Sequence, residues 1–476
     1  MRQRMGAWMD HASVWSLAVA LSFLPFWRHR VLLHRAPEAV FFEFHDFVFY
    51  TQDALWLAAL GLWLSARLLA DERPPWRTGP RPLWMGLAGL LALSLPGVPQ
   101  AVDPPYAAYQ FAHLCLAFGL YLLTLNASLT PGWVAGSVAV GSVIQAGLAI
   151  PQFILGHWVG LKRWGEVRFD ATEPGAAVVI LNGERWARAY GWTQHPNLLG
   201  GCLMVFLLVL ISYYVQRSQQ EGEARGRPSR KVRITSSDIA FLSAIALALT
   251  ALSLTFSRSA WLGALVGLLA ALSLILLQGQ GRALWTRRSV DLIVLALVIV
   301  SAFVGLTWSG LEARLGMRVE GTEIRSVEER QTLAQGAYAL IQQRPWLGVG
   351  LGNFATALYE LARNSVVDYP IYQPVHSVFL LATAELGPLG GGLWLWLLGV
   401  PWWILWRGRR RVRMTLGLAA WSGALLALAA VSWFDSYIWA SHQGRLLQWL
   451  AWGFWARAWH EASASKRSVD GLGERS

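Results

Sequence analysis

Three arginines and two histidines stand where apolar stretches of this sequence meet polar ones: Arg188, His195, Arg258, Arg330 and His376. The planar fork of an arginine binds a phosphate group better than lysine does. A neutral imidazole can take a proton from an incoming hydroxyl near neutral pH. If the fold brings these residues together, they predict a site in which arginines hold a diphosphate leaving group and a histidine activates an acceptor.

Two further polar residues lie close to these in the sequence. Asn197 follows His195 at the start of an apolar run, and Glu385 lies about two and a half helical turns beyond His376 inside another. Carboxylates inside membrane helices are functional candidates by default. Each of these residues can also have a purely structural role. Residues 195–197 can begin a helix at its proline. Arg258 can snorkel from a turn, and Glu385 can pair with an arginine.

Motifs for metals and cofactors are missing from the sequence. It contains no H-E-x-x-H, no Walker loop and no clear acidic metal cluster. Gly348, Gly350 and Gly352 loosely resemble a dinucleotide loop, but no strand precedes them, so they indicate close backbone approach or a flexible loop. Cys115 and Cys202 have no CxxC spacing and indicate neither a disulfide nor a metal site. We therefore expect no metal ion and no cofactor, so the energy for a reaction must come from an activated bond in the substrate.

The composition predicts that membrane helices carry these residues. Of 476 residues, 55% are hydrophobic and only 14% are charged, and there are 28 tryptophans. These values exclude a disordered chain and are typical of a polytopic helical membrane protein, in which tryptophan gathers at the membrane interfaces. The net charge of +12 fits basic loops that set the membrane orientation, so we do not expect a nucleic-acid partner.

Apolar runs of a length that crosses a bilayer predict about twelve transmembrane helices in an all-α fold. The first run follows Arg2 and Arg4 and has no clean small-x-small cleavage signal, so we expect a retained span. The run 376–406 contains Gly387 and Pro388, which predict a kink. The expected spans are 7–27, 47–70, 83–99, 107–126, 132–155, 197–215, 238–256, 259–278, 290–309, 376–406, 414–434 and 446–459.

Three very basic connections predict the orientation of these spans. They follow the sixth, eighth and tenth spans, so they share one side, which the positive-inside rule assigns to the cytoplasm. Against this, Arg28, Arg30 and Arg35 would lie outside, unless the chain near Pro37 forms a re-entrant or interfacial piece. The basic connections contain Arg217, Arg225, Arg227, Arg230, Lys231 and Arg233; Arg282, Arg287 and Arg288; and Arg407, Arg409, Arg410, Arg411 and Arg413.

This orientation places two long connections outside the cell membrane. We expect a single transmembrane domain, 1–476, with a first extracytoplasmic loop at 156–196 and a large extracytoplasmic loop at 310–373. A loop of that length is usually functional or carries structure of its own. Residues 327–342 have no helix breaker, so we expect the large loop to form a helical cap over the bundle.

Several short motifs resemble the O-antigen ligase/polymerase family of bacterial membrane glycosyltransferases. They extend over about 185–395, whereas the first 180 residues match only in hydropathy. The motifs are 191–197 before a span, the turn Ser257-Arg258-Ser259-Ala260-Trp261, Arg330 followed by 345–350 and Asn353-Phe354, and His376 followed by Glu385-Leu386-Gly387.

The resemblance implies a fold of about a dozen helices with a large periplasmic loop. It implies transfer of a glycan from undecaprenyl diphosphate to a sugar hydroxyl, without a metal or nucleotide, at the outer face of the bacterial inner membrane. Arg258 and Arg330 would then hold the diphosphate, and His376 would be the base. Arg188, His195, Asn197 and Glu385 would be further substrate-binding candidates. Many family members have asparagine after the histidine, whereas this chain has Ser377.

The sequence leaves several alternatives open. The acceptor is a lipid A core for a ligase or another glycan for a polymerase, and no residue pattern decides between them. A polysaccharide or lipid transporter without catalysis is the main alternative, although transporters usually place ionisable groups near the bilayer midplane and often have repeated halves. A scaffold for an assembly complex is a third, in which Arg258 and His376 would be replaceable.

Overall fold

Helices make up most of the computed structural model, which describes residues 2–35, 39–70, 75–224, 235–314, 321–363 and 372–473. Each of the twelve expected apolar runs folds as a helix. They are α1 (Arg2–Ser22), α2 (Thr51–Leu69), α3 (Arg81–Gly97), α4 (Pro104–Asn126), α5 (Pro131–Leu155), α6 (Pro196–Ala224), α7 (Ser236–Leu254), α8 (Arg258–Leu277), α9 (Arg287–Arg314), α12 (Val378–Gly408), α13 (Leu416–Val431) and α15 (His442–Gly473).

Seven helices of the described chain are long and apolar enough to cross a membrane. They are α4, α5, α6 as far as Arg217, α7, α8, α9 as far as Glu312, and α12, while α13 is apolar but shorter. The chain is therefore a helical integral membrane protein, and twelve spans remain a prediction. Helix starts follow ordinary capping chemistry: Asp103 and Thr130 accept hydrogen bonds from backbone N–H groups of α4 and α5, which both begin with proline.

Small residues let neighbouring helices approach closely in the bundle. At the crossing of α8 and α13, a Cβ on Gly423 would lie 2.3 Å from the carbonyl oxygen of Gly267. Only glycine fits such a contact, which is typical of packing between membrane helices.

The described chain also contains two β-hairpins, so the expectation of an all-α fold is wrong in this detail. Strand β1 (His29–Leu33) pairs antiparallel with β2 (Phe47–Tyr50), and β3 (Val178–Leu181) pairs with β4 (Glu184–Ala187). The second hairpin turns at Asn182-Gly183, both with positive φ. That dipeptide is a strong signal for a two-residue hairpin turn. The hydropathy pattern alone does not predict the hairpin.

The connections expected outside the membrane carry this extra structure. Residues 156–195 contain the short helix η2 (Lys162–Trp164) and the hairpin β3–β4. The segment after α9 contains α10 (Gly321–Gln343), which includes the expected helix, and α11 (Phe354–Arg363). The remaining short helices are η1 (Phe42–Phe44), η3 (Gly281–Leu284) and α14 (Tyr437–Ala440).

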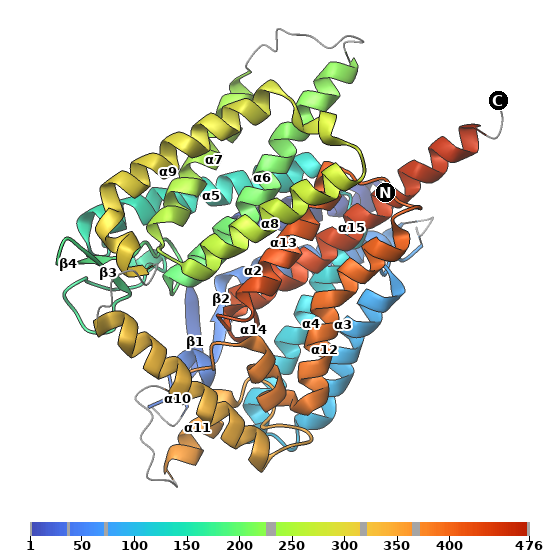
Figure 1. Cartoon of the computed structure of the whole chain (residues 1–476). Coiled ribbons are helices and arrows are strands. Elements are labelled where there is room, and N and C mark those ends of the chain that lie inside the picture. Colours follow the sequence, from blue (N-terminus) through green and yellow to red (C-terminus); the bar gives the residue numbers. More distant parts are fainter. Residues whose placement is uncertain are drawn as a thin grey trace.

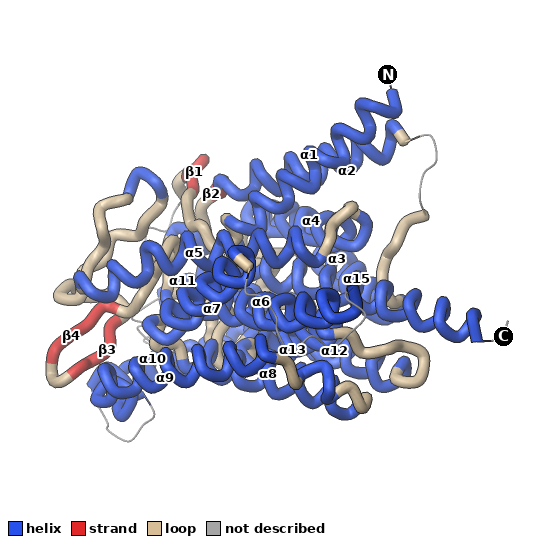
Figure 2. Tube along the Cα trace, turned by 90° about the horizontal axis from the view of Figure 1, so that it is seen from above, coloured by secondary structure: helices blue, strands red, loops and turns tan. Residues whose placement is uncertain are grey.

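The two ends of the bundle differ in what they carry. The hairpin β3–β4 lies at the end opposite the two termini in both views (Figures 1 and 2). At the opposite end of α9 from this hairpin, Arg288 pairs with Asp238 at 2.8 Å. Most of the arginines expected between α6 and α7 (225–233) lie outside the described residues, as does Pro37.

Arg35, which opposed the predicted orientation, is paired. Its guanidinium donates two hydrogen bonds to Asp103, of 2.5 and 2.9 Å. This bidentate pair satisfies the guanidinium within the protein and ties the chain before β2 to the start of α4.

Helix α12 has the expected kink at Gly387, where φ is +72°. Pro388 has no N–H, so the usual partner of the Ala384 carbonyl is missing. The loop before α11 supplies replacements, because Val349 N–H donates to Ala384 O at 2.8 Å and Gly350 N–H donates to Glu385 O at 2.9 Å. The glycine-rich loop is therefore anchored on α12, as close backbone approach predicted, and is not a freely moving loop.

Candidate active site

His376 lies beside a carboxylate that sequence analysis did not identify. Its Nδ1 atom is 3.9 Å from Oδ1 of Asp435, an ion-pair distance and not a hydrogen bond. The backbone brings them together, because Val378 N–H at the start of α12 donates to Ser432 O at the end of α13. Nδ1 is buried while the His376 side chain is 26% exposed, so the rest of the ring is accessible to solvent.

Asn197 and Arg188 extend this cluster. The Asn197 amide donates to Oδ2 of Asp435 at 2.6 Å, and its oxygen accepts from Nη2 of Arg188 at 2.6 Å. The buried Arg188 also donates from Nε to the carbonyl oxygen of Thr255 at 2.6 Å. Arg188 therefore links the start of α6 to the turn that precedes α8.

The carboxylate of Asp435 is held in its charged form. Burial alone would raise its pKa, but the neighbouring His376 and the Asn197 amide together lower it. The Ser436 backbone N–H donates to Oδ1 at 2.9 Å as well. A charged Asp435 at this position can orient His376 and stabilise its imidazolium form.

His195 belongs to the same cluster. Its Nδ1 accepts a hydrogen bond from the backbone N–H of Asn197 at 3.1 Å. The ring is accessible to solvent, yet the surrounding protein and then the charge of Arg188 lower its pKa. This direction favours the neutral form of His195, which can donate a hydrogen bond from Nε2.

Arg258 begins α8 directly after this region, in the turn 255–257. Phe256 in that turn has φ +47°, an uncommon conformation for a bulky residue and one that clusters at functional sites. Arg258 donates from Nη1 to the carbonyl oxygen of Arg314 at 3.2 Å, and Arg314 in turn donates to Val178 O of β3 at 3.1 Å. The charge of Arg314 also acts on His195, so a second arginine at the end of α9 lies near the cluster.

The structure does not bring two of the predicted residues into contact with this cluster. Arg330 lies on α10, half-buried, and makes no hydrogen bond or ion pair with the described residues. Glu385 is buried at the α12 kink, where Oε2 accepts a hydrogen bond from Trp439 Nε1 at 2.9 Å. Its contacts are therefore those of an anchor for the kink and the 348–353 loop.

Asp435 and Arg314 were missed because neither stands in a recognisable pattern. Asp435 follows an apolar run and lies 59 positions (435 − 376) from His376, so only the packing of α12 on α13 reveals the pair. Arg314 ends α9 in a charged stretch that resembles a solvated surface. Within the described residues, one group of His and Asp side chains has metal-ligand spacing, Asp53 with His113 and His442, and it lies outside this cluster.

Comparison with known proteins agrees with the motifs. The family model described as O-antigen ligase matches residues 243–395, which include Arg258, Arg330, His376 and Glu385. No curated protein matched the chain. The family match therefore confirms the resemblance carried by the sequence motifs, and the chain contains an O-antigen ligase family region.

Proposed function

We propose that this chain transfers a glycan from undecaprenyl diphosphate to a sugar hydroxyl, as an O-antigen ligase or a surface polysaccharide polymerase. The observation that carries the proposal is the cluster at the start of α12, where the partly exposed His376 faces Asp435 beside Asn197 and Arg188. The family match supports a transferase that acts on polyprenyl-linked glycan and a glycan acceptor.

The proposed reaction is a single displacement. His376 takes the proton of the acceptor hydroxyl, and the hydroxyl oxygen forms a bond to the anomeric carbon of the donor glycan. The bond from that carbon to the diphosphate oxygen breaks, and undecaprenyl diphosphate leaves with the electron pair. Arg258 binds the charge that develops on the diphosphate, and Arg330 joins it from α10.

Three other residues would support this chemistry without taking part in bond changes. Asp435 orients His376 and balances its charge after proton transfer. Asn197 holds Asp435, and the neutral His195 donates a hydrogen bond to the substrate. The reaction needs no metal and no nucleotide, because the glycosyl diphosphate bond is already activated.

The proposed location is the extracytoplasmic face of the bacterial inner membrane. The basic connections α6–α7, α8–α9 and α12–α13 would lie in the cytoplasm with both termini. The hairpin β3–β4 lies at the other end of the bundle, and Arg314 links it to the turn that carries Arg258. The active site would therefore open outside, where lipid-linked glycans are displayed.

Reconstitution tests the proposal. The purified chain in lipid nanodiscs is given an undecaprenyl-diphosphate-linked oligosaccharide with either a lipid A core or a second copy of that oligosaccharide as acceptor. We expect glycan transfer to one acceptor and release of undecaprenyl diphosphate. Absence of transfer to both acceptors, with the donor bound, would contradict the proposal and favour a transporter.

A charge-conserving substitution sharpens this test. Arg258→Lys keeps the positive charge but loses the two-pronged contact with diphosphate, so we expect turnover to fall by about tenfold or more. Arg409→Lys at the opposite end of the bundle is the matched control and should leave turnover unchanged. Full activity of Arg258→Lys would show that Arg258 only snorkels.

A further inference from the structure

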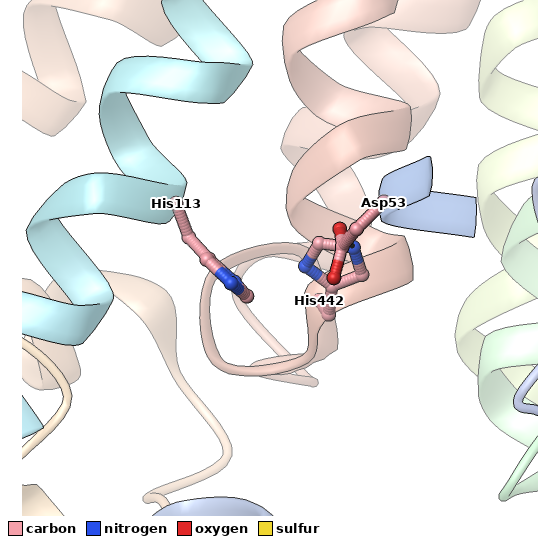
Figure 3. A group of neighbouring side chains, drawn as sticks. All are labelled: Asp53, His113 and His442. Atoms are coloured by element: carbon pink, nitrogen blue, oxygen red, sulfur yellow. Dashed lines mark ion pairs between the residues drawn. The ribbon is translucent and has the colours of Figure 1, made fainter. Parts of the chain in front are cut away.

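A second group of titratable side chains lies outside the proposed active site. Asp53 is the third residue of α2, His113 lies in α4, and His442 is the first residue of α15. Their potential ligand atoms all lie within 4.8 Å of one another. Figure 3 shows His113 reaching from α4 toward Asp53 and His442.

Asp53 and His442 present two buried ligand atoms to the same point between α2 and α15. Oδ1 of Asp53 and Nε2 of His442 are 2.8 Å apart, an ideal hydrogen-bond distance. Both atoms are nevertheless buried and neither makes a well-directed hydrogen bond. Both atoms are therefore available as ligands, and a metal ion bound between them would satisfy both.

Neighbouring groups hold these ligands in place. The Tyr50 backbone N–H donates to Oδ2 of Asp53 at 3.0 Å, which leaves Oδ1 directed at His442. The Tyr50 ring stacks on the His442 imidazole with centroids 4.4 Å apart and planes 3° apart. The ring centroids of Tyr109 and His113 are 4.5 Å apart. Such outer contacts orient the ligands of metal sites.

We propose that Asp53, His113 and His442 bind one divalent transition cation of the zinc type. Two imidazoles and one carboxylate are ligands that such ions prefer, whereas Ca²⁺ and Mg²⁺ require more oxygen atoms. In a tetrahedral zinc site, two ligand atoms lie about 3.4 Å apart. Here the Asp53 and His442 ligand atoms are 2.8 Å apart, and all three ligand atoms lie within 4.8 Å of one another. Water would be the fourth ligand beside these three side chains.

The cation would join three helices that are far apart in the sequence. His113 lies 60 positions after Asp53 (113 − 53), and His442 lies 329 positions after His113 (442 − 113). His442 also lies seven positions after Asp435, across α14. The ion would therefore fix the start of α15 and the segment that presents Asp435, as a structural site apart from the reacting atoms. Metal binding at this position does not depend on whether the chain is a transferase.

Metal analysis of the purified full chain tests the site. The chain is stripped with chelator, titrated with Zn²⁺, freed of excess ion and analysed by elemental mass spectrometry. We expect about one zinc per chain and a visible Co²⁺ spectrum after cobalt substitution. His113→Ala should hold less than a fifth of the wild-type metal, and the control His157→Ala, an exposed histidine in the 156–195 segment, should hold the full amount.

A second measurement, the shift of the melting temperature on adding Zn²⁺, tests the site even if His113→Ala folds poorly. Zn²⁺ should raise the melting temperature of the wild type by several degrees and leave that of Asp53→Asn unchanged, since an ion that binds only the folded state stabilises it. A wild-type chain that holds less than a tenth of an equivalent of Zn²⁺ would overturn the proposal. Equal zinc binding by wild type and both variants would overturn it as well.

Discussion

Two Asp–His pairs of this molecule show how enclosure changes what the same residue types can do. At the start of α12, His376 is 26% exposed and lies 3.9 Å from Asp435. At the start of α15, the side chain of His442 is only 5% exposed and lies 2.8 Å from Asp53 under the ring of Tyr50. An imidazole that reaches solvent can exchange protons with a substrate, whereas one enclosed by protein can only hold its neighbours together.

The enclosed pair should therefore matter most for stability. Asp53→Asn removes a buried carboxylate that faces His442 and accepts the Tyr50 backbone N–H, so we expect the free energy of unfolding to fall by about 3 kcal/mol. Chemical unfolding of the purified protein followed by tryptophan fluorescence measures this. If the free energy of unfolding falls by less than about 1 kcal/mol, the enclosed pair does not contribute more to stability than the open pair.

The buried Glu43 beside the enclosed pair should make stability depend on pH. It accepts a hydrogen bond from the Tyr50 hydroxyl at 2.8 Å, and burial raises its pKa to about 7. The folded state therefore holds a proton that the unfolded state releases near pH 4.5, so stability falls as the pH rises from about 4.5 to 7.

The substitution Glu43→Gln removes this titration. As the pH rises from about 4.5 to 7, the free energy of unfolding of the wild type should decrease by about 3 kcal/mol relative to that of the variant. Thermal unfolding of both proteins at several pH values checks it. Parallel pH profiles for the two proteins would show that Glu43 does not titrate there.

The open pair should show the opposite pattern, with a larger effect on turnover than on stability. Asp435→Asn leaves His376 without a charged partner, so we expect glycan transfer to slow by about tenfold to hundredfold. Because the pKa of Asp435 is lowered, its charge is lost only under acidic conditions, and the wild-type rate should show no titration of Asp435 between pH 6 and 9. Glu184→Gln, an exposed site in the hairpin β3–β4, serves as control. Wild-type turnover in Asp435→Asn would contradict a positioning role.

Helices were easier to predict from this sequence than contacts. Apolar runs located twelve of the described helices, since bilayer-length hydrophobicity is a local property of the chain. The kink at Gly387 and Pro388 was also predicted locally. The hairpin at 178–187 was missed because its Asn182-Gly183 turn was read as part of a loop, although the dipeptide was a usable signal.

The candidate sites depend on contacts that no short motif contains. His376 was identified from its place at a helix start, but its partner Asp435 comes from the end of another apolar run. Asp53, His113 and His442 stand alone in the sequence and meet only because α2, α4 and α15 pack together. The participation of Arg330 remains a prediction, since nothing in the described chain joins it to the cluster.

The most direct test of the account is the turnover of His376→Ala per folded molecule. Transfer from the undecaprenyl-diphosphate-linked oligosaccharide is measured in nanodiscs for this variant, for the wild type and for the control His157→Ala, with melting temperatures recorded for each. We expect turnover of His376→Ala to fall by about a thousandfold at an unchanged melting temperature. Transfer at the wild-type rate by a folded His376→Ala protein would contradict a base at this position.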